Sequence, residues 1–209
     1  MNTVTIVDYG LGNLYSVINA FSRLGVVPRI AESGAALDDA ELVVLPGVGA
    51  FGDGMAGLRE RGHAEALIRH AERGRPLVGI CLGAQLLMSD SEEFGTHAGL
   101  GIIPGAVRQI PSDGVKVPLV GWRRLGEPSP GDWAGTLLGD AQPGAWMYFV
   151  HSFHCVPDAS TNLLATTSHG PHRIHAAVHR GSVTGFQFHP EKSGAAGMNI
   201  LKNFLNIKP

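Results

Sequence analysis

The sequence is poor in cysteine and in charge, and it has no long apolar run. With two cysteines in 209 residues there is no disulfide framework, which is typical of a reducing compartment, so we expect a cytoplasmic protein. Charged residues make up 16% of the chain and the net charge is −2, so no basic footprint for nucleic acid is present. No apolar run approaches the roughly 20 residues of a membrane span. Met1–Val4 lacks the basic and apolar regions of a signal peptide.

Motifs for nucleotide cofactors and metals are missing or incomplete. Gly10 and Gly12 begin a dinucleotide-loop pattern, but Tyr15 stands where its third glycine belongs. No Gly-Lys-Ser/Thr sequence of an ATP-binding loop occurs. Four histidines have a spacing that would form a metal-binding stripe on a helix, but a Gly-Pro pair among them disfavours a helix: His169, His172, His175 and His179. We therefore expect no metal and no other cofactor.

What the sequence does contain is an alternation of apolar runs with helix-like segments. In the first half, strands are predicted at Val4–Val7, Val26–Ile30, Leu42–Leu45 and Pro76–Ile80, and helices at Leu14–Leu24, Met55–Glu72 and Leu82–Met88. After Gly95, short runs predict strands and hairpins at Leu100–Ile103, Val115–Val120, Leu137–Leu138, Trp146–Val150, Leu163–Thr167, Ala176–Val178 and Val183–Phe188, followed by a helix at Ala195–Leu205. This order predicts an α/β fold with a mostly parallel central sheet and additional hairpins, in one domain over residues 1–209.

Cys81 lies at the predicted junction between a buried strand and a helix. Gly79 and Gly83 flank it, and small residues at these positions permit a sharp backbone turn. The pattern matches the logic of the Gly-x-Ser-x-Gly nucleophile elbow, with cysteine in place of serine. A thiol at the N-terminal end of a helix is also stabilised as the thiolate by the helix dipole. The same pattern is compatible with a structural core cysteine, so Cys81 alone does not decide between the two roles.

A second stretch supplies the partners that a nucleophilic cysteine needs. His189 and Glu191 follow the alternating run Val183–Phe188 directly, on a short turn that contains Pro190. A cysteine nucleophile requires a histidine base, and the base requires an acceptor that orients it. We therefore predict a catalytic triad of Cys81, His189 and Glu191, assembled in space from distant parts of the chain. Cys155 has no such context and is interpreted as a free, nonessential thiol.

These stretches resemble the class I (triad) glutamine amidotransferases. Over nearly its whole length the chain is similar to the glutaminase subunits of imidazole glycerol phosphate synthase, from Asp8-Tyr9-Gly10-x-Gly12-Asn13 to Asn203-Phe204-Leu205. The resemblance implies a flavodoxin-like α/β fold and the hydrolysis of glutamine to glutamate and ammonia, with a glutamyl thioester on Cys81.

The resemblance also assigns the residues around the triad. Tetrahedral intermediates of acyl transfer need preorganised donors, and the N–H groups of Leu82 and Val48 are implied as the oxyanion donors. In this family the Val48 donor is thought to turn correctly only when the synthase is engaged. The residues implied in substrate binding lie in four separate segments: Gly49, Gln85, Glu93, and the backbone at Ser152 and Phe153. Taken without the resemblance, Pro46–Gly54 is either a ligand-facing loop or a flexible surface loop, and Glu93 belongs to a solvated charge pair.

A partner chain is implied because the ammonia needs an acceptor site. The resemblance names a (βα)8-barrel cyclase subunit in a heterodimer, which makes imidazole glycerol phosphate and an aminoimidazole carboxamide ribotide in histidine biosynthesis. The residues implied to face the cyclase are Asn13, Trp122, Tyr148, His151 and Lys192. Without the resemblance, Trp122 is compatible with ordinary core packing.

The chain departs from the family pattern beside these residues. Leu119 and Arg123 replace a histidine and an asparagine around Gly121-Trp122, Phe153 replaces a frequent tyrosine, and Ala84 replaces a frequent methionine. None of these changes affects the triad. They leave open a paralogous subunit that serves another synthase, beside a stand-alone γ-glutamyl hydrolase and a catalytically silent binding subunit.

Overall fold

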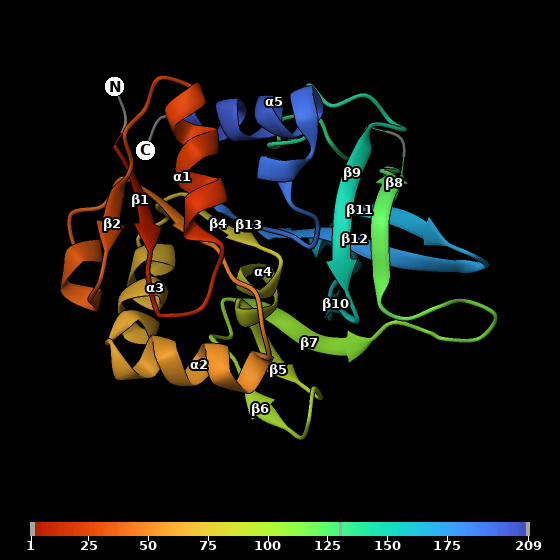
Figure 1. The fold of residues 1–209 in the computed structure, drawn as a ribbon, viewed down its shortest axis with the longest axis horizontal. Helices are drawn as coiled ribbons and strands as arrows, with labels where there is room; N and C mark the ends of the chain where they lie inside the picture. The colour runs from red at the N-terminus through yellow and green to blue at the C-terminus, as the bar shows by residue number, and fades with distance from the viewer. Residues whose placement is uncertain (1–2, 130, 208–209) are drawn as a thin grey trace.

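The computed structural model of the protein describes residues 3–129 and 131–207 and is built around a seven-stranded sheet (Figure 1). The strand order is β11-β12-β13-β4-β3-β1-β2, and the five strands from β13 to β2 are parallel. β11 and β12 pair in antiparallel fashion at one edge. The bounds are β1 Val4–Val7, β2 Arg29–Ala31, β3 Leu42–Leu45, β4 Leu77–Ile80, β11 Leu163–His169, β12 His172–Arg180 and β13 Val183–Phe186.

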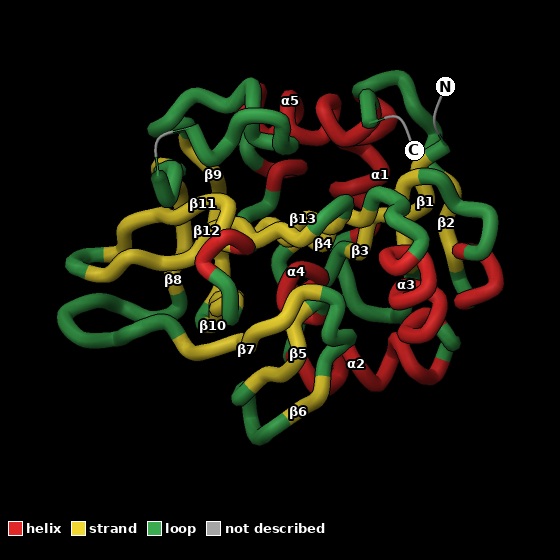
Figure 2. The backbone as a smooth tube through the Cα atoms, turned by 180° about the vertical axis from the view of Figure 1, so that it is seen from behind, coloured by secondary structure: helices red, strands yellow, loops and turns green. Residues whose placement is uncertain are grey.

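Helices cover both faces of this sheet because its strands are apolar on both sides. α1 (Leu14–Arg23) and α5 (Gly194–Leu205) lie on one face, and α2 (Phe51–Glu60), α3 (His63–Glu72) and α4 (Leu82–Leu86) lie on the other (Figures 1 and 2). Ile6 packs in the cluster with Phe21 of α1 and Phe204 of α5, whereas its neighbour Val7 packs in the cluster with Leu58 of α2. Among the described residues, no helix combines the length and the apolar character of a membrane span.

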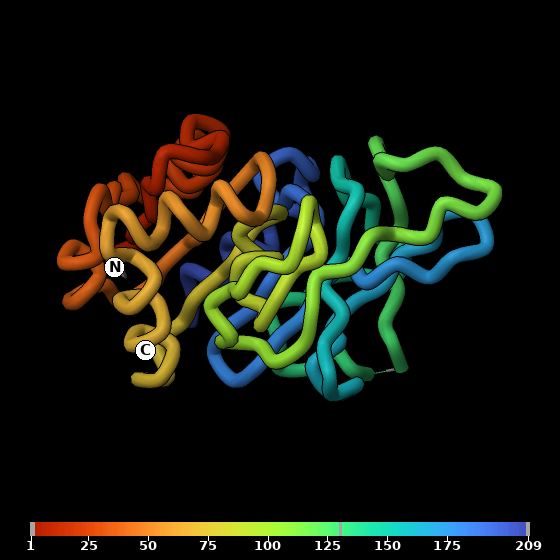
Figure 3. Tube along the Cα trace, turned by 90° about the horizontal axis from the view of Figure 1, so that it is seen from below, coloured from red at the N-terminus to blue at the C-terminus, as the bar shows by residue number. Residues whose placement is uncertain are grey.

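Two smaller sheets extend the central one. β10 (Phe153–Pro157), β7 (Ile103–Gln109), β5 (Met88–Ser91) and β6 (His97–Ala98) form the first, and β8 (Leu119–Arg124) and β9 (Trp146–His151) form the second. Viewed from below, α1 to α3 occupy one side of the molecule and the β8–β9 ribbon lies toward the other (Figure 3). α4 and the end of β4 lie between these two parts, where the predicted triad also falls.

The predicted fold class is confirmed, and the differences are local. The helix predicted at Met55–Glu72 is two helices, because Gly62 adopts a left-handed φ of 69° and separates α2 from α3. The second strand is shorter than predicted and forms the sheet edge, as Pro28 indicated. Met88 begins a strand rather than ending a helix. Leu137–Leu138 lies in a turn region and not in a strand.

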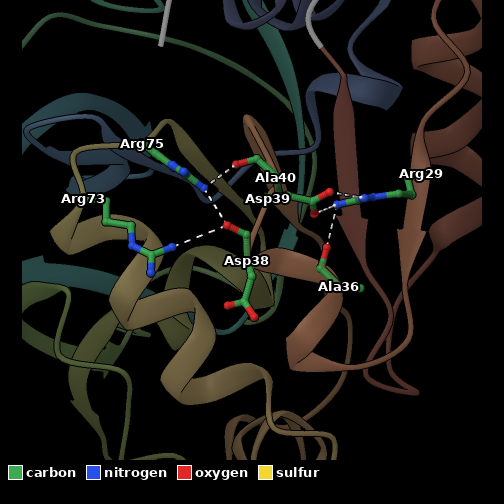
Figure 4. Close-up of polar contacts among 7 residues, drawn as sticks. All are labelled: Arg29, Ala36, Asp38, Asp39, Ala40, Arg73 and Arg75. Atoms are coloured by element: carbon green, nitrogen blue, oxygen red, sulfur yellow. Dashed lines mark hydrogen bonds and ion pairs between the residues drawn. The ribbon is translucent and has the colours of Figure 1, made fainter.

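A group of arginines fixes the segment that leads into β3, at the amino-terminal end of that strand (Figure 4). Arg29 binds both carboxylate oxygens of Asp39, at 2.7 and 3.2 Å, and this bond holds the pKa of Asp39 below its usual range. Arg73 and Arg75 donate to the Asp38 carbonyl oxygen, and Arg75 also reaches that of Ala40. The segment between α3 and β4 is thereby tied to the segment before β3. Strands β3 and β4 in turn position the turn that holds Cys81.

Candidate active site

Cys81 occupies a strained turn between β4 and α4. Its backbone has φ 56° and ψ −111°, a conformation that is costly for a residue with a side chain and is found mainly at functional sites. Its N–H donates to the Phe186 carbonyl at 2.7 Å, which ties the turn to β13. A Cβ added at Gly83 would overlap the Leu45 carbonyl oxygen, and one at Gly79 would lie 2.7 Å from the Gly83 carbonyl oxygen. The predicted strand–turn–helix context of Cys81, with small flanking residues, is confirmed.

His189 and Glu191 form a buried ion pair on the turn that follows β13. Nδ1 of His189 lies 2.8 Å from Oε1 of Glu191, and the two side chains are 2% and 1% exposed. The backbone of His189 is held from both sides, because its N–H donates to Tyr148 and its carbonyl accepts from the Ser193 hydroxyl. The backbone is thus fixed, and the bond to Glu191 together with burial restricts rotation of the imidazole.

This surrounding favours a charged imidazole. Burial lowers the pKa of His189, but the interactions with Cys81 and Glu191 outweigh it and raise the pKa to about 9. Since Glu191 holds Nδ1, the other nitrogen, Nε2, is the one available to Cys81, and it has no other hydrogen-bond partner among the described residues. The site can thus hold a thiolate beside an imidazolium, as cysteine nucleophiles require.

A cavity of about 350 Å³ opens beside Cys81 and brings together the residues predicted for oxyanion and substrate binding. Its volume suits a small amino-acid ligand. The lining residues that were predicted for these two roles are Val48, Gly49, Leu82, Gln85, Glu93, Ser152 and Phe153. Pro118, Val150 and His151 complete the wall.

Glu93 and its neighbour Glu92 have different surroundings. The carboxylate of Glu93 lines the cavity and accepts from the Phe51 N–H at 2.7 Å, at the start of α2. Glu92 accepts from the Gln109 N–H at 2.8 Å and lies 3.7 Å from Arg108, outside the cavity. Of the two carboxylates, that of Glu93 is therefore the one placed to meet a ligand ammonium group.

One of the two predicted oxyanion donors, the Leu82 N–H, is not free in this conformation. The Leu82 N–H donates to the Gly47 carbonyl oxygen at 3.3 Å, so a second acceptor would have to replace that oxygen. Val48 is half-exposed at the cavity wall, and Gly49 has a φ of 122° that few other residues adopt. The Gly47 carbonyl oxygen therefore competes with any oxyanion for the Leu82 N–H in this conformation.

Of the residues predicted to face a partner, four lie at or near the surface. Trp122 of β8 and Tyr148 of β9 are register partners with ring centroids 6.0 Å apart, and the Tyr148 ring lies 6.5 Å from that of His189. Lys192 is exposed on the turn of the triad, and Asn13 caps α1 by accepting from the Ser16 N–H. His151 differs, because it is only 7% exposed and lines the cavity.

The β8–β9 ribbon exposes several large apolar side chains. Its exposed apolar residues are Val120, Trp122, Trp146 and Val150. Val120 and Val150 are register partners, whereas Trp122 pairs with Tyr148 and Trp146 pairs with the exposed Arg124. A contiguous apolar face beside a cavity is typical of a protein-binding surface. Of these exposed apolar residues, only Trp122 was named from the sequence as facing a partner.

The remaining candidates lie outside the cavity wall. Cys155 is buried in β10, and burial raises its pKa above the usual range. The four spaced histidines lie on β11 and β12, and each ring binds a different backbone carbonyl, of Lys116, Asp113, Cys155 or Thr161. Each of these rings therefore makes a structural hydrogen bond within the fold. Gln187, which was not singled out from the sequence, lies in contact with Cys81.

Comparison with known proteins agrees with this geometry. The family model for glutamine amidotransferase class-I matches residues 5–207. The chain is 45% identical over 204 residues to imidazole glycerol phosphate synthase subunit HisH of Moorella thermoacetica, which covers 98% of this chain and 94% of that protein. It is 42% identical over 213 residues to subunit HisH 1 of Legionella pneumophila (strain Lens), which covers 99% and 100%.

Solved structures show the same fold. The chain superposes on the structure of PurLQS from Thermotoga maritima with a TM-score of 0.77 and 26% identity, over 98% of each chain. A crystal structure of a glutamine amidotransferase matches with a TM-score of 0.76 and 18% identity, over 98% of this chain and 97% of the other. The second likeness shows the fold alone.

Proposed function

This chain belongs to the class I glutamine amidotransferase family, and on that premise we propose that it is the glutaminase subunit of imidazole glycerol phosphate synthase, in histidine biosynthesis. It hydrolyses glutamine to glutamate and ammonia. The observation that carries the mechanism is the strained, buried turn that holds Cys81 beside the His189–Glu191 pair at the wall of the cavity.

The reaction proceeds through a thioester on Cys81. The thiolate attacks the carboxamide carbon of glutamine, and the imidazolium of His189 gives its proton to the departing amine, so that ammonia leaves. Water then attacks the thioester, His189 takes its proton, and glutamate and the thiol are released. Glu191 keeps the proton-bearing Nδ1 oriented throughout and stabilises the imidazolium.

The cavity wall supplies recognition and stabilises the transition state. Glu93 binds the α-ammonium group of glutamine, and the backbone at Ser152 and Phe153 receives its α-carboxylate. The oxyanion accepts from Leu82 and Val48, and one such donor contributes about 3 kcal/mol in acyl-transfer enzymes. Because the Leu82 N–H is engaged by Gly47, the unassisted chain turns over slowly until the Pro46–Ala50 segment rearranges.

The partner is the cyclase subunit of the synthase, bound as a heterodimer in the cytoplasm. The apolar face of the β8–β9 ribbon is the docking surface, and Asn13 and Lys192 extend it past the mouth of the site. The rings of Tyr148 and His189 lie 6.5 Å apart, which supports a docking surface next to the base. Docking therefore positions the ammonia for transfer and favours the rearrangement that frees the oxyanion donors.

An electrophile that mimics glutamine tests the site directly. After incubation with such a reagent in the presence of the liganded cyclase, peptide mass spectrometry should find the adduct on Cys81 and not on the buried Cys155. His189→Ala should slow the labelling, whereas His172→Ala, on the far hairpin, should not. Labelling of Cys155, or equal labelling in His189→Ala, would contradict the proposed chemistry.

A further inference from the structure

Gln187 is brought against the nucleophile by the pairing of β13 with β4. In that parallel pair Phe186 lies opposite Ile80, so the next residues along the two strands, Gln187 and Cys81, also lie side by side. The backbone N–H of Gln187 donates to the Ala176 carbonyl at 2.9 Å, and the residue is 2% exposed. The position of Gln187 is thus fixed by the sheet and not by a loop.

The orientation of the Gln187 amide is determined by a chain of hydrogen bonds. The Phe153 carbonyl can only accept, so the group of Gln85 that lies 3.1 Å from it is the amide nitrogen. The same nitrogen lies 3.1 Å from Oε1 of Gln187, which must then be the oxygen. The Nε2 of Gln187 therefore points away from Gln85 and toward Sγ of Cys81, at 3.9 Å.

Two contacts on the sulfur favour opposite protonation states. Sγ of Cys81 lies 4.0 Å from the Val150 carbonyl oxygen, which can accept only from a protonated thiol. The N–H of Gln187 donates to the sulfur, and donation to a charged acceptor is stronger than donation to a neutral one. Gln187 therefore favours the thiolate, which is the state that attacks.

We propose that Gln187 is a further catalytic residue, whose side-chain amide stabilises the thiolate of Cys81 and holds it in position. Through Gln85 the amide is connected to the Phe153 carbonyl, in the segment that closes the cavity. The inference rests on the proposed function, because it concerns the nucleophile of that reaction. It adds to the triad a contact that reaches the sulfur directly.

The other titratable groups near the sulfur come from several elements. His189 follows β13, the Tyr9 hydroxyl lies after β1, and Cys155 lies in β10, and each interacts electrostatically with Cys81. Burial, and secondarily Cys81, raises the pKa of Tyr9 and of Cys155 above the usual range. Tyr9 and Cys155 therefore stay neutral over the pH range in which an ordinary thiol loses its proton. Of the three groups, only His189 changes charge in that range.

The experiment measures how fast iodoacetamide alkylates Cys81 as a function of pH in the chain alone, by peptide mass spectrometry. Gln187→Met has a similar length and no donor, and it should raise the midpoint of the profile by about one pH unit, which is about tenfold less thiolate below the midpoint. Gln187→Glu should raise it further, because a carboxylate still accepts from Gln85 but repels the thiolate. Gln142→Met, the same change at an exposed site, should leave the profile unchanged.

Superimposable profiles for the wild type and both Gln187 variants would overturn the inference. So would a uniform loss of rate at every pH with the midpoint unchanged, since that result indicates packing alone. If Gln187→Met does not fold, Gln187→Leu, which also lacks the donor and adds no charge, carries the test. Neither glutamine nor the cyclase is needed, so a wild-type Cys81 that is unreactive at every pH would instead contradict the proposed function.

Discussion

Replacing Glu191 by glutamine tests how the triad keeps its base charged. Glu191→Gln preserves the shape of the side chain but removes the charge that lies 2.8 Å from Nδ1 of His189. The variant amide can also present its N–H group to the ring, which favours the wrong tautomer. Burial, which acts to lower the pKa of His189, would then be opposed only by Cys81.

The size of the effect follows from the pKa of His189, which rises from 6.5 to about 9. A shift of that size corresponds to about 3 kcal/mol in favour of the imidazolium in the folded state. The stabilisation is fully present below pH 6.5 and is lost as the pH rises through about 9. Glu191→Gln removes the part of this stabilisation that the carboxylate supplies, so kcat/KM should fall by about tenfold before the tautomer adds its own loss.

Two measurements check this prediction. NMR titration of the His189 ring should show its midpoint falling by at least about one pH unit in Glu191→Gln. Glutamine turnover with the liganded cyclase should fall by about ten- to a hundredfold at neutral pH, while Glu60→Gln, an exposed control, stays at the wild-type rate. An unshifted His189 midpoint together with full activity would refute the role assigned to Glu191.

Three further changes have defined outcomes. Gly83→Ala should lower the melting temperature by several degrees, because its Cβ overlaps a carbonyl of β3, whereas Gly126→Ala, with its nearest atom at 3.6 Å, should not; equal melting curves would contradict this. Burial is the main cause that lowers the pKa of His154 to about 3, so as the pH falls below about 6.5 the unfolded chain binds a proton that the folded chain does not, and the folded state loses stability. In urea unfolding, His154→Gln should remove up to about 1.4 kcal/mol per pH unit from this dependence of stability on pH. An unchanged dependence would be inconsistent with a neutral buried ring. Trp122→Ala should weaken cyclase binding by about 2 kcal/mol in calorimetry, whereas the exposed-site control Val27→Ala should not. Equal affinities of the wild type and Trp122→Ala would show that the ribbon face is not part of the interface.

The sequence predicted the fold class because its strands are short, apolar and separated by helix-like segments. Val4–Val7 and Leu42–Leu45 are strands with the predicted bounds. The break at Gly62 was missed because a single glycine is tolerated inside many helices, and only its left-handed φ identifies it as a boundary. β10 was missed because Phe153–Pro157 gains its stability from pairing with β7, a contact distant in sequence.

The site was predictable as a set of residues but not as a set of contacts. Cys81 and His189 could be named from local patterns, since an elbow and a base on a stiff turn each have a sequence signature. The bond from Leu82 to Gly47 and the contact of Gln187 with the sulfur depend on strand register and backbone orientation. His151 was predicted to face the partner, and its place in the cavity wall, opposite Leu119 in the ribbon, could not be read from the sequence.

The central claim is that this chain is a glutaminase whose site becomes competent when a cyclase docks. Glutamine turnover should be measured for the chain alone and with an imidazole glycerol phosphate synthase cyclase and its nucleotide ligand, with Cys81→Ala as the blank. We expect very slow turnover alone and strong stimulation by the liganded cyclase, because Gly47 occupies the Leu82 donor in the unassisted chain. Full activity without the cyclase, or no activity with it, would contradict the claim.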